Sequence, residues 1–160
     1  MGMSLNIMRE PVGVEYRLLL ETLLAVCSRA LLVVRDSLTI NSIGKQKLMS
    51  LEPYLISRDV RDEWPGTKLL SGTARVQEYI FDGACCETLC HAVDGLYDWQ
   101  QPTAPEDLCL LRNDGSPTLV SIAHEKDSYL DLTSQELSCL ENSCESWFKL
   151  LESLRTEEQG

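Results

Sequence analysis

The sequence predicts an α+β fold, a two-layer domain whose antiparallel sheet, a β-meander, is covered by N-terminal and C-terminal helices. Apolar residues recur at helical spacing near both ends of the chain, and two β-rich runs joined by an Asp-Gly turn lie between them. A chain of 160 residues suits one hydrophobic core. We therefore expect a single globular domain over 1–155 and a disordered tail over 156–160.

The first helix is expected from about 12 to 28, because apolar residues recur there every three or four positions and Pro11 suits a first helical turn. The next apolar run, 30–34, is rich in β-formers and favours a strand, although a continuing helix is an alternative. A second helix is expected over 42–51. It ends there because Pro53 biases the preceding Glu52 toward an extended conformation.

The middle of the chain is expected to contain a loop, a strand and a helix. Mixed charges and the run Trp64-Pro65-Gly66-Thr67 indicate a loop over 56–72, whose Trp packs back onto the core. A strand is expected over 73–81. Asp82 then opens a compact helix with cysteines on its apolar face, and Asp94-Gly95 ends this helix.

The best-supported strands form a meander. The runs 108–112 and 118–124 are joined by 113–116, which contains the Asp-Gly pair of a hairpin turn. A third short strand is expected over 128–132. Before these strands, 96–107 reads as an aromatic loop with prolines.

The last helix follows the capping box Thr133-Ser134-Gln135-Glu136, and its apolar stripe runs from Leu137 to Leu154. We expect this stripe to pack against the sheet, with Trp147 buried at its middle. The same stripe could instead form the seam of a homodimer, so a dimer is an open alternative.

The net charge of −11 argues against nucleic acid as a partner, because affinity for phosphates comes from Lys and Arg. The charge is uneven: residues 1–68 carry nine basic and eight acidic side chains, whereas 69–160 carry five and seventeen. No Lys or Arg occurs over 76–111. The second half is therefore expected to present an acidic surface, which either aids solubility or steers a basic protein partner.

The first ten residues, MGMSLNIMRE, lack the basic and apolar regions of a secretory signal. The longest apolar passage, 18–34, is interrupted by Glu21, Ser28 and Arg29, whereas a membrane span needs roughly 20 mainly apolar residues. A cytoplasmic protein with no membrane partner is expected.

Seven cysteines in a chain without a secretory signal favour reduced thiols over a disulfide framework. No Cys-x-x-Cys pair occurs, and the spacings Cys86-x3-Cys90 and Cys139-x4-Cys144 are those of a helix face. We expect these thiols to pack in the core and to bind no metal. The sequence also lacks a phosphate-binding loop, so no cofactor is expected.

One catalytic alternative is a small hydrolase or thiol-dependent enzyme, in which His124 is a general base and Cys109 a nucleophile. Strand alternation argues against it, because Val120, Ile122 and His124 would share one face while Glu125 would point to the other. We therefore assign no catalytic residue.

The favoured function is non-enzymatic protein binding, because the loop before the meander combines aromatic and acidic side chains. Trp and Tyr are frequent interface anchors, and acidic neighbours select a basic partner. The alternative is that Trp99 closes the end of the core. The candidate partner-binding residues are Asp94, Tyr97, Asp98, Trp99, Glu106 and Asp107.

Five spaced motifs carry a resemblance to a class of known proteins: Trp64-Pro65-Gly66-Thr67, Tyr97-x-Trp99, Pro105-Glu106-Asp107-Leu108, Asn113-Asp114-Gly115 and Ala123-His124-Glu125. Over about 61–132 the chain resembles small, uncharacterised bacterial proteins that are similar to the immunity proteins of polymorphic toxin systems. Such proteins neutralise a cognate toxin by binding it. The resemblance implies a cytoplasmic, non-enzymatic binder, and its motifs are structural landmarks that transfer no binding residue.

Overall fold

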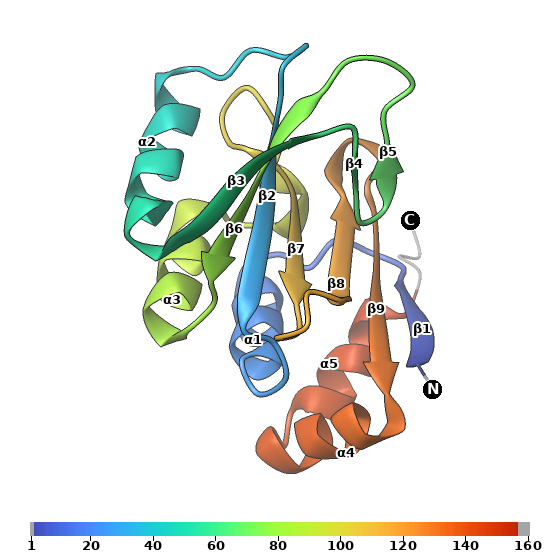
Figure 1. Cartoon of the computed structure of the whole chain (residues 1–160). Helices are drawn as coiled ribbons and strands as arrows, with labels where there is room; N and C mark the ends of the chain where they lie inside the picture. The colour runs from blue at the N-terminus through green and yellow to red at the C-terminus, as the bar shows by residue number, and fades with distance from the viewer. Residues whose placement is uncertain (1, 157–160) are drawn as a thin grey trace.

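The computed structural model describes residues 2–156, which form a seven-stranded antiparallel sheet, a small hairpin and five helices. The sheet order is β1-β9-β8-β7-β2-β6-β3, so β7 is the middle strand and β1 and β3 are the two edges (Figure 1). The predicted α+β fold with an antiparallel sheet is confirmed. The strands are β1 (Gly2–Ile7), β2 (Arg29–Arg35), β3 (Leu55–Arg61), β4 (Glu63–Trp64), β5 (Thr67–Lys68), β6 (Ala74–Ile80), β7 (Glu106–Leu111), β8 (Pro117–Ile122) and β9 (Asp127–Thr133). The helices are α1 (Val14–Leu23), α2 (Ser42–Leu51), α3 (Gly83–Ala92), α4 (Ser134–Ser143) and α5 (Trp147–Leu154), with 3-10 turns η1 (Glu52–Tyr54), η2 (Leu96–Asp98) and η3 (Ala123–Glu125).

The predicted meander is present as β7, β8 and β9, each antiparallel to the next. Gly115 lies in the β7-β8 turn with φ +87°, a conformation that glycine adopts without strain. The apolar run of β2 is buried between β6 and β7. The run 30–34 is therefore a strand, and its helical alternative is excluded.

The main core lies between one face of the sheet and the helices. α1 packs against α3, α4 and α5 (Figure 1). Leu51 of α2 joins the same core. Burying a large apolar side chain stabilises the fold by roughly 1.5–3 kcal/mol. The largest fully buried side chains include Tyr16, Leu19, Leu20, Leu32, Trp99 and Trp147.

Side-chain caps begin three of the helices, and the caps at Asp82 and Thr133 are where the sequence predicts a helix start. Asn41 caps α2, Asp82 caps α3, and Thr133 and Glu136 make the reciprocal bonds of a capping box before α4. Each cap satisfies an amide N–H that the first helical turn leaves free. The expected helix over 42–51 has the same bounds in the structure.

The other face of the sheet is partly covered by the β4-β5 hairpin. Trp64 is 3% exposed and packs in a second, smaller core with Val33, Val76 and Val120. The expectation that Trp64 packs back onto a core is thus confirmed. The expectation of a loop over 56–72 is wrong, because this segment contains β3 and the hairpin.

The edge strands β1 and β3 are the elements that the sequence patterns miss. Most of their residues are exposed or half-buried, on both faces. The alternation of apolar and polar residues that marks a half-buried strand is therefore weak in them.

The helices at the two ends of the chain differ from expectation. α1 is shorter than 12–28, since it begins after Gly13, whose φ is +64°, and gives way to turns after Leu23. The stripe from Leu137 to Leu154 is divided between α4 and α5, because Cys144 takes an extended conformation. Trp147 is buried as expected, but it is the first residue of α5.

The remaining expectations concern membrane spans, the C-terminal tail and the domain bounds. Within residues 2–156, no helix has the length and apolar character needed to cross a membrane. The expected tail over 156–160 lies, except for Thr156, outside the described residues. The single domain over 1–155 stays a prediction.

Trp147→Ala is expected to lower the free energy of unfolding by about 3–5 kcal/mol, because it leaves a cavity in the main core. The neighbouring Phe148 is 66% exposed, so Phe148→Ala is the matched control and should change this free energy by less than about 0.5 kcal/mol. Urea denaturation followed by circular dichroism measures both. A Trp147→Ala protein that kept its stability but changed from dimer to monomer would place the stripe in a dimer interface instead.

Candidate functional site

The six candidate partner-binding residues separate into two groups in the structure. Tyr97, Trp99, Glu106 and Asp107 are buried, and only Asp94 and Asp98 are exposed. The two aromatic rings therefore do not lie on the surface as interface anchors. Trp99 has the position that the alternative interpretation gave it, at the end of the main core.

Hydrogen bonds fix both aromatic residues from within. The Trp99 indole N–H donates to the Tyr16 hydroxyl at 3.0 Å, and this hydroxyl donates to the Leu89 carbonyl at 2.8 Å. The Tyr97 hydroxyl lies 2.7 Å from that of Ser128 on β9. These buried bonds hold the segment after α3 against α1, α3 and β9.

The two buried carboxylates meet a cation from the central part of the sheet. Arg35, at the end of β2, places Nη2 3.7 Å from Asp107 Oδ2 and Nε 3.9 Å from Glu106 Oε2. Its guanidinium lies 5.3 Å from the centre of the Trp64 ring, a cation-π distance. His124 Nδ1 lies 3.4 Å from Arg35 Nη2. We call Arg35, Trp64, Glu106, Asp107 and His124 the Arg35 cluster.

Asp107 is the most connected member of the cluster. Its carboxylate accepts the Trp64 indole N–H at 3.1 Å and the Ala123 backbone N–H at 2.9 Å. Its backbone has φ +56°, a left-handed conformation that Asp tolerates better than most residues. One side chain thus ties the β4-β5 hairpin and η3 to the start of β7.

Glu106 is 1% exposed, and one of its two oxygens is unsatisfied. Oε1 accepts the Gln101 backbone N–H at 3.0 Å, whereas Oε2 has no hydrogen-bond partner. Burial, and to a smaller extent the charge of Asp107, raise the pKa of Glu106, while the Gln101 bond and Arg35 oppose the rise. This carboxyl group therefore holds its proton to a higher pH than a carboxyl in water.

The cluster also brings together three groups that ligate metals. Ligand atoms of Glu106, Asp107 and His124 lie within 4.8 Å of one another. However, the Arg35 guanidinium already lies against all three, at 3.4 to 3.9 Å. A fixed cation thus compensates the carboxylates, and a metal ion would have to displace it.

The geometry does not favour Cys109 as a nucleophile. It is fully buried, and burial raises its pKa to about 12, whereas a reactive thiol needs a lowered pKa and access. The expectation that strand 118–124 carries His124 is wrong, because β8 ends at Ile122 and the His124 ring is 41% exposed in η3. The alternation argument fails with it, since His124 Nε2 lies 3.9 Å from Glu125 Oε1.

The motifs behind the resemblance are buried in part: their Trp side chains and the run Pro105-Glu106-Asp107-Leu108 are buried, whereas Asn113, Asp114, His124 and Glu125 are exposed. Two hydrogen bonds join these segments directly. The Trp64 indole N–H donates to Asp107 Oδ2, and the Asp107 backbone N–H donates to the Trp99 carbonyl. These residues thus organise the fold. A partner could reach only the exposed side chains among them, of which Asp98 lies between the two buried aromatic residues.

One such surface surrounds the exposed pair found from the sequence. Asp94 and Asp98 line a polar hollow of about 460 Å³ beside Tyr97. Glu10 reaches the same place, where its carboxylate accepts the Tyr97 backbone N–H at 2.8 Å. The charges of Asp127 and Glu10 both act on the Tyr97 hydroxyl. We call Glu10, Asp94, Asp98 and Asp127 the acidic rim; all four are exposed or half-buried.

The acidic rim holds like charges close together. Asp98 accepts the Gly95 N–H at 2.9 Å, which fixes its carboxylate near that of Glu10. Burial is the main cause that raises the pKa of Glu10, and the charge of Asp98 adds a smaller rise, while the Tyr97 hydrogen bond and, less strongly, Lys126 oppose it. The backbone of η2 therefore positions two carboxylates that repel each other.

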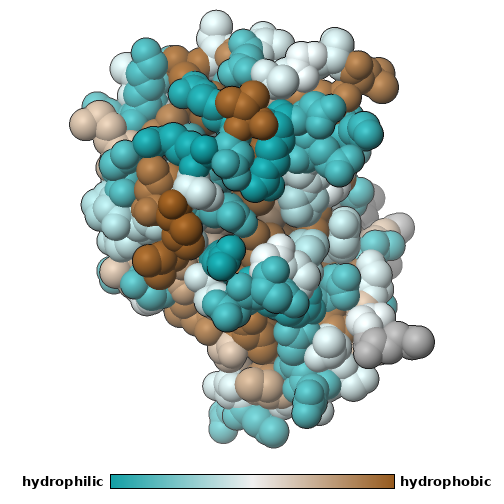
Figure 2. Space-filling model, viewed as in Figure 1, coloured by the Kyte–Doolittle hydropathy of each residue, from teal (hydrophilic) through white to brown (hydrophobic). Residues whose placement is uncertain are grey.

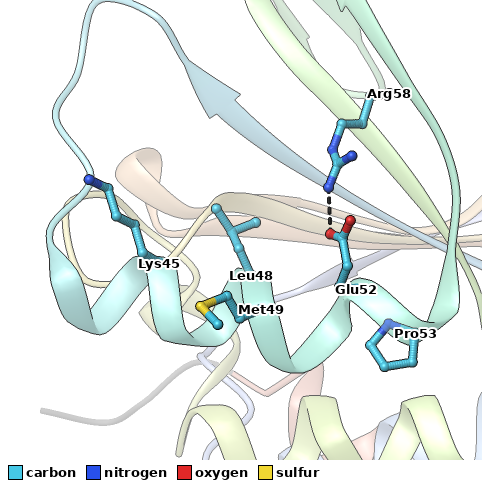
Figure 3. Close-up of a pocket in the computed structure, with 6 residues that line it drawn as sticks. All are labelled: Lys45, Leu48, Met49, Glu52, Pro53 and Arg58. Carbon is cyan, nitrogen blue, oxygen red and sulfur yellow. Dashed lines mark hydrogen bonds and ion pairs between the residues drawn. The ribbon is translucent and has the colours of Figure 1, made fainter.

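A second hollow, of about 730 Å³, lies between α2 and β3 (Figure 3). Leu48, Met49 and Pro53 give it an apolar floor, and Arg58 pairs with Glu52 at its side. Met49 is 74% exposed. Hydrophobic side chains gather over this part of the surface among hydrophilic ones (Figure 2).

Two functional positions were missed from the sequence. Arg35 directly follows the buried run of β2, and a charge at the end of a buried strand is a signal that it has a partner inside the fold. Glu10 gives no such signal, because its contact with Tyr97 joins residues 87 positions apart.

Comparisons with known proteins add nothing to this geometry, since no family model, no curated protein and no solved structure matches the chain.

Asp107→Ala is expected to lower the free energy of unfolding by about 3–5 kcal/mol, because it leaves Arg35 and two buried N–H donors without their acceptor. Asp107→Asn keeps one acceptor and the tolerance for positive φ, so its loss should be smaller. Chemical denaturation measures this order. Glu125→Ala, an exposed neighbour in η3, is the control and should leave stability nearly unchanged.

Glu106→Gln is expected to change how stability depends on pH. The folded pKa of Glu106 is raised above its ordinary value of 4.5, so the folded state binds the proton more tightly than the unfolded state does. The contribution of this group to stability is therefore greatest below pH 4.5 and falls as the pH rises through the folded pKa. Glu106→Gln removes this fall.

Unfolding free energies measured for both proteins from about pH 4 to 7 check the expectation. The difference, wild type minus Glu106→Gln, should decrease with rising pH. Glu10 titrates in both proteins and cancels in the difference. A difference that stays constant over this range contradicts the raised pKa.

Proposed function

We propose that the protein is a non-enzymatic binding module that takes a basic protein partner at the acidic rim. The observation that carries the proposal is the fixed proximity of Glu10 and Asp98, held by the backbone N–H groups of Tyr97 and Gly95. Keeping like charges together costs stability. A Lys or Arg side chain from a partner would relieve this repulsion, and binding then gains from it.

The surroundings of the rim support a protein partner. Val12 pairs with Gly95 through an isolated β-bridge and is 50% exposed, so an apolar contact lies next to the carboxylates. Interfaces combine such apolar contacts with complementary charges that speed association. A polyanion such as nucleic acid would be repelled by the same rim and by the net charge of −11.

An immunity-like inhibitor is the more specific form of this proposal. It rests on the motif resemblance over about 61–132, in which the partner is a toxin that binding neutralises. Three of the four rim residues, Asp94, Asp98 and Asp127, lie within that region. In this form the rim covers a basic surface of the toxin.

The test compares two double variants that remove the same charge. Asp94→Asn/Asp127→Asn changes the exposed rim without touching the capping bond of Asp98, whereas Glu141→Gln/Glu145→Gln changes exposed carboxylates on and after α4. The immobilised proteins capture partners from the lysate of the native cell at low and high salt. Bound proteins are quantified by mass spectrometry.

We expect one basic protein to be retained by the wild type and by the α4 variant, and to be lost from the rim variant. Retention should weaken with salt, because exposed charges are screened. Equal retention by all three proteins, or no salt-sensitive basic protein at all, contradicts the proposal.

A further inference from the structure

The edge strand β3 is open along its outer side. β3 pairs with β6 alone among the strands that residues 2–156 contain. Val60 is 70% exposed and Ile56 is 45% exposed. An edge of this length presents free N–H and C=O groups that can pair with another strand.

The charges of this edge are self-complementary. The sequence from Arg58 to Asp62 reads Arg-Asp-Val-Arg-Asp. In an antiparallel pair of identical strands the residues that face each other are related by a two-fold axis, and the axis passes through one residue. An axis at Val60 places Asp59 of each copy opposite Arg61 of the other. Within one chain the same two side chains already pair, with Arg61 Nη2 2.9 Å from Asp59 Oδ2, so in the dimer each Arg61 lies between two such carboxylates.

Neighbouring registers are unfavourable. An axis at Arg58, Asp59 or Arg61 places that residue opposite its own copy, so that like charges face each other across the strands. Directly opposed like charges destabilise a strand pair, and opposite charges stabilise it. Axes at Ile56 or Ser57 bring no charges of opposite sign across from each other. Among axes within β3, the one at Val60 is therefore the register in which opposite charges face each other.

The groove between α2 and β3 adds an apolar contact to the same edge. Arg58 points toward α2, where it pairs with Glu52 beside Met49 (Figure 3). Val60 lies two residues further and shares that face of the strand. A two-fold axis perpendicular to the sheet keeps α2 of both copies on the same face of the sheet. The apolar grooves of both copies therefore lie beside the paired β3 strands.

We propose that two copies of this chain associate through β3, with antiparallel pairing centred on Val60, to form a continuous sheet. The occupant of the edge and of the groove beside it is thus a second copy of this chain. The interface is isologous, because each copy contributes Asp59 to the partner's Arg61 and Arg61 to the partner's Asp59. The acidic rim takes no part in it, so the dimer and the partner-binding proposal stand separately.

The test is a charge exchange between Asp59, which is exposed, and Arg61, which is half-buried. Asp59→Arg places Arg opposite Arg61, and Arg61→Asp places Asp opposite Asp59, so each single variant should weaken dimerisation by about tenfold or more. The double variant Asp59→Arg/Arg61→Asp restores opposite charges and should restore the dimer. Glu141→Arg on α4 is the control for an added positive charge.

Sedimentation equilibrium over a range of concentrations gives the dimer dissociation constant of each protein, and circular dichroism confirms that each is folded. The expected order is tight association for the wild type, the double variant and Glu141→Arg, and weak association for the two single variants. A wild type that is monomeric at every concentration overturns the proposal. A dimer that ignores the single variants, or a double variant that stays monomeric, also overturns it.

Discussion

The carboxylate of Asp107 holds together three segments that lie far apart in the chain. It joins the start of β7 to the indole of Trp64 and to the backbone at Ala123, while Arg35 supplies the opposing charge. The main core does not depend on such a buried carboxylate, because helices cover that face of the sheet. On the second face a short hairpin must be held by polar bonds, and a buried charge is stable there only with these partners.

The sequence patterns predict well the parts of the fold that are decided by local physics. α3 follows from its apolar face and from Asp82 at its start, and the β7-β8 hairpin follows from its Asp-Gly turn. β1 and β3 are not predictable in this way, because an edge strand has little buried surface to impose an alternation. The break between α4 and α5 is equally hidden, since no Gly or Pro marks it.

The site follows the same division. The pair Glu106-Asp107 stands out in the sequence as two adjacent acids, but its burial depends on Arg35, which reaches it only through the order of the strands. Asp94 and Asp98 are exposed as an acidic loop suggests, whereas the aromatic residues between and beside them face inward. Composition therefore predicts the charge of a surface, and topology decides which residues form it.

The pairing of β1 with β9 has a consequence for the order of folding. Leu5 lies opposite Leu130, and Gly2 lies opposite Thr133. During synthesis the first strand can find its neighbour only after residue 133 has left the ribosome, so the rest of the sheet has time to assemble first. Contacts this distant in sequence slow folding, and the waiting N-terminal segment is a point where chaperones can act on the growing chain.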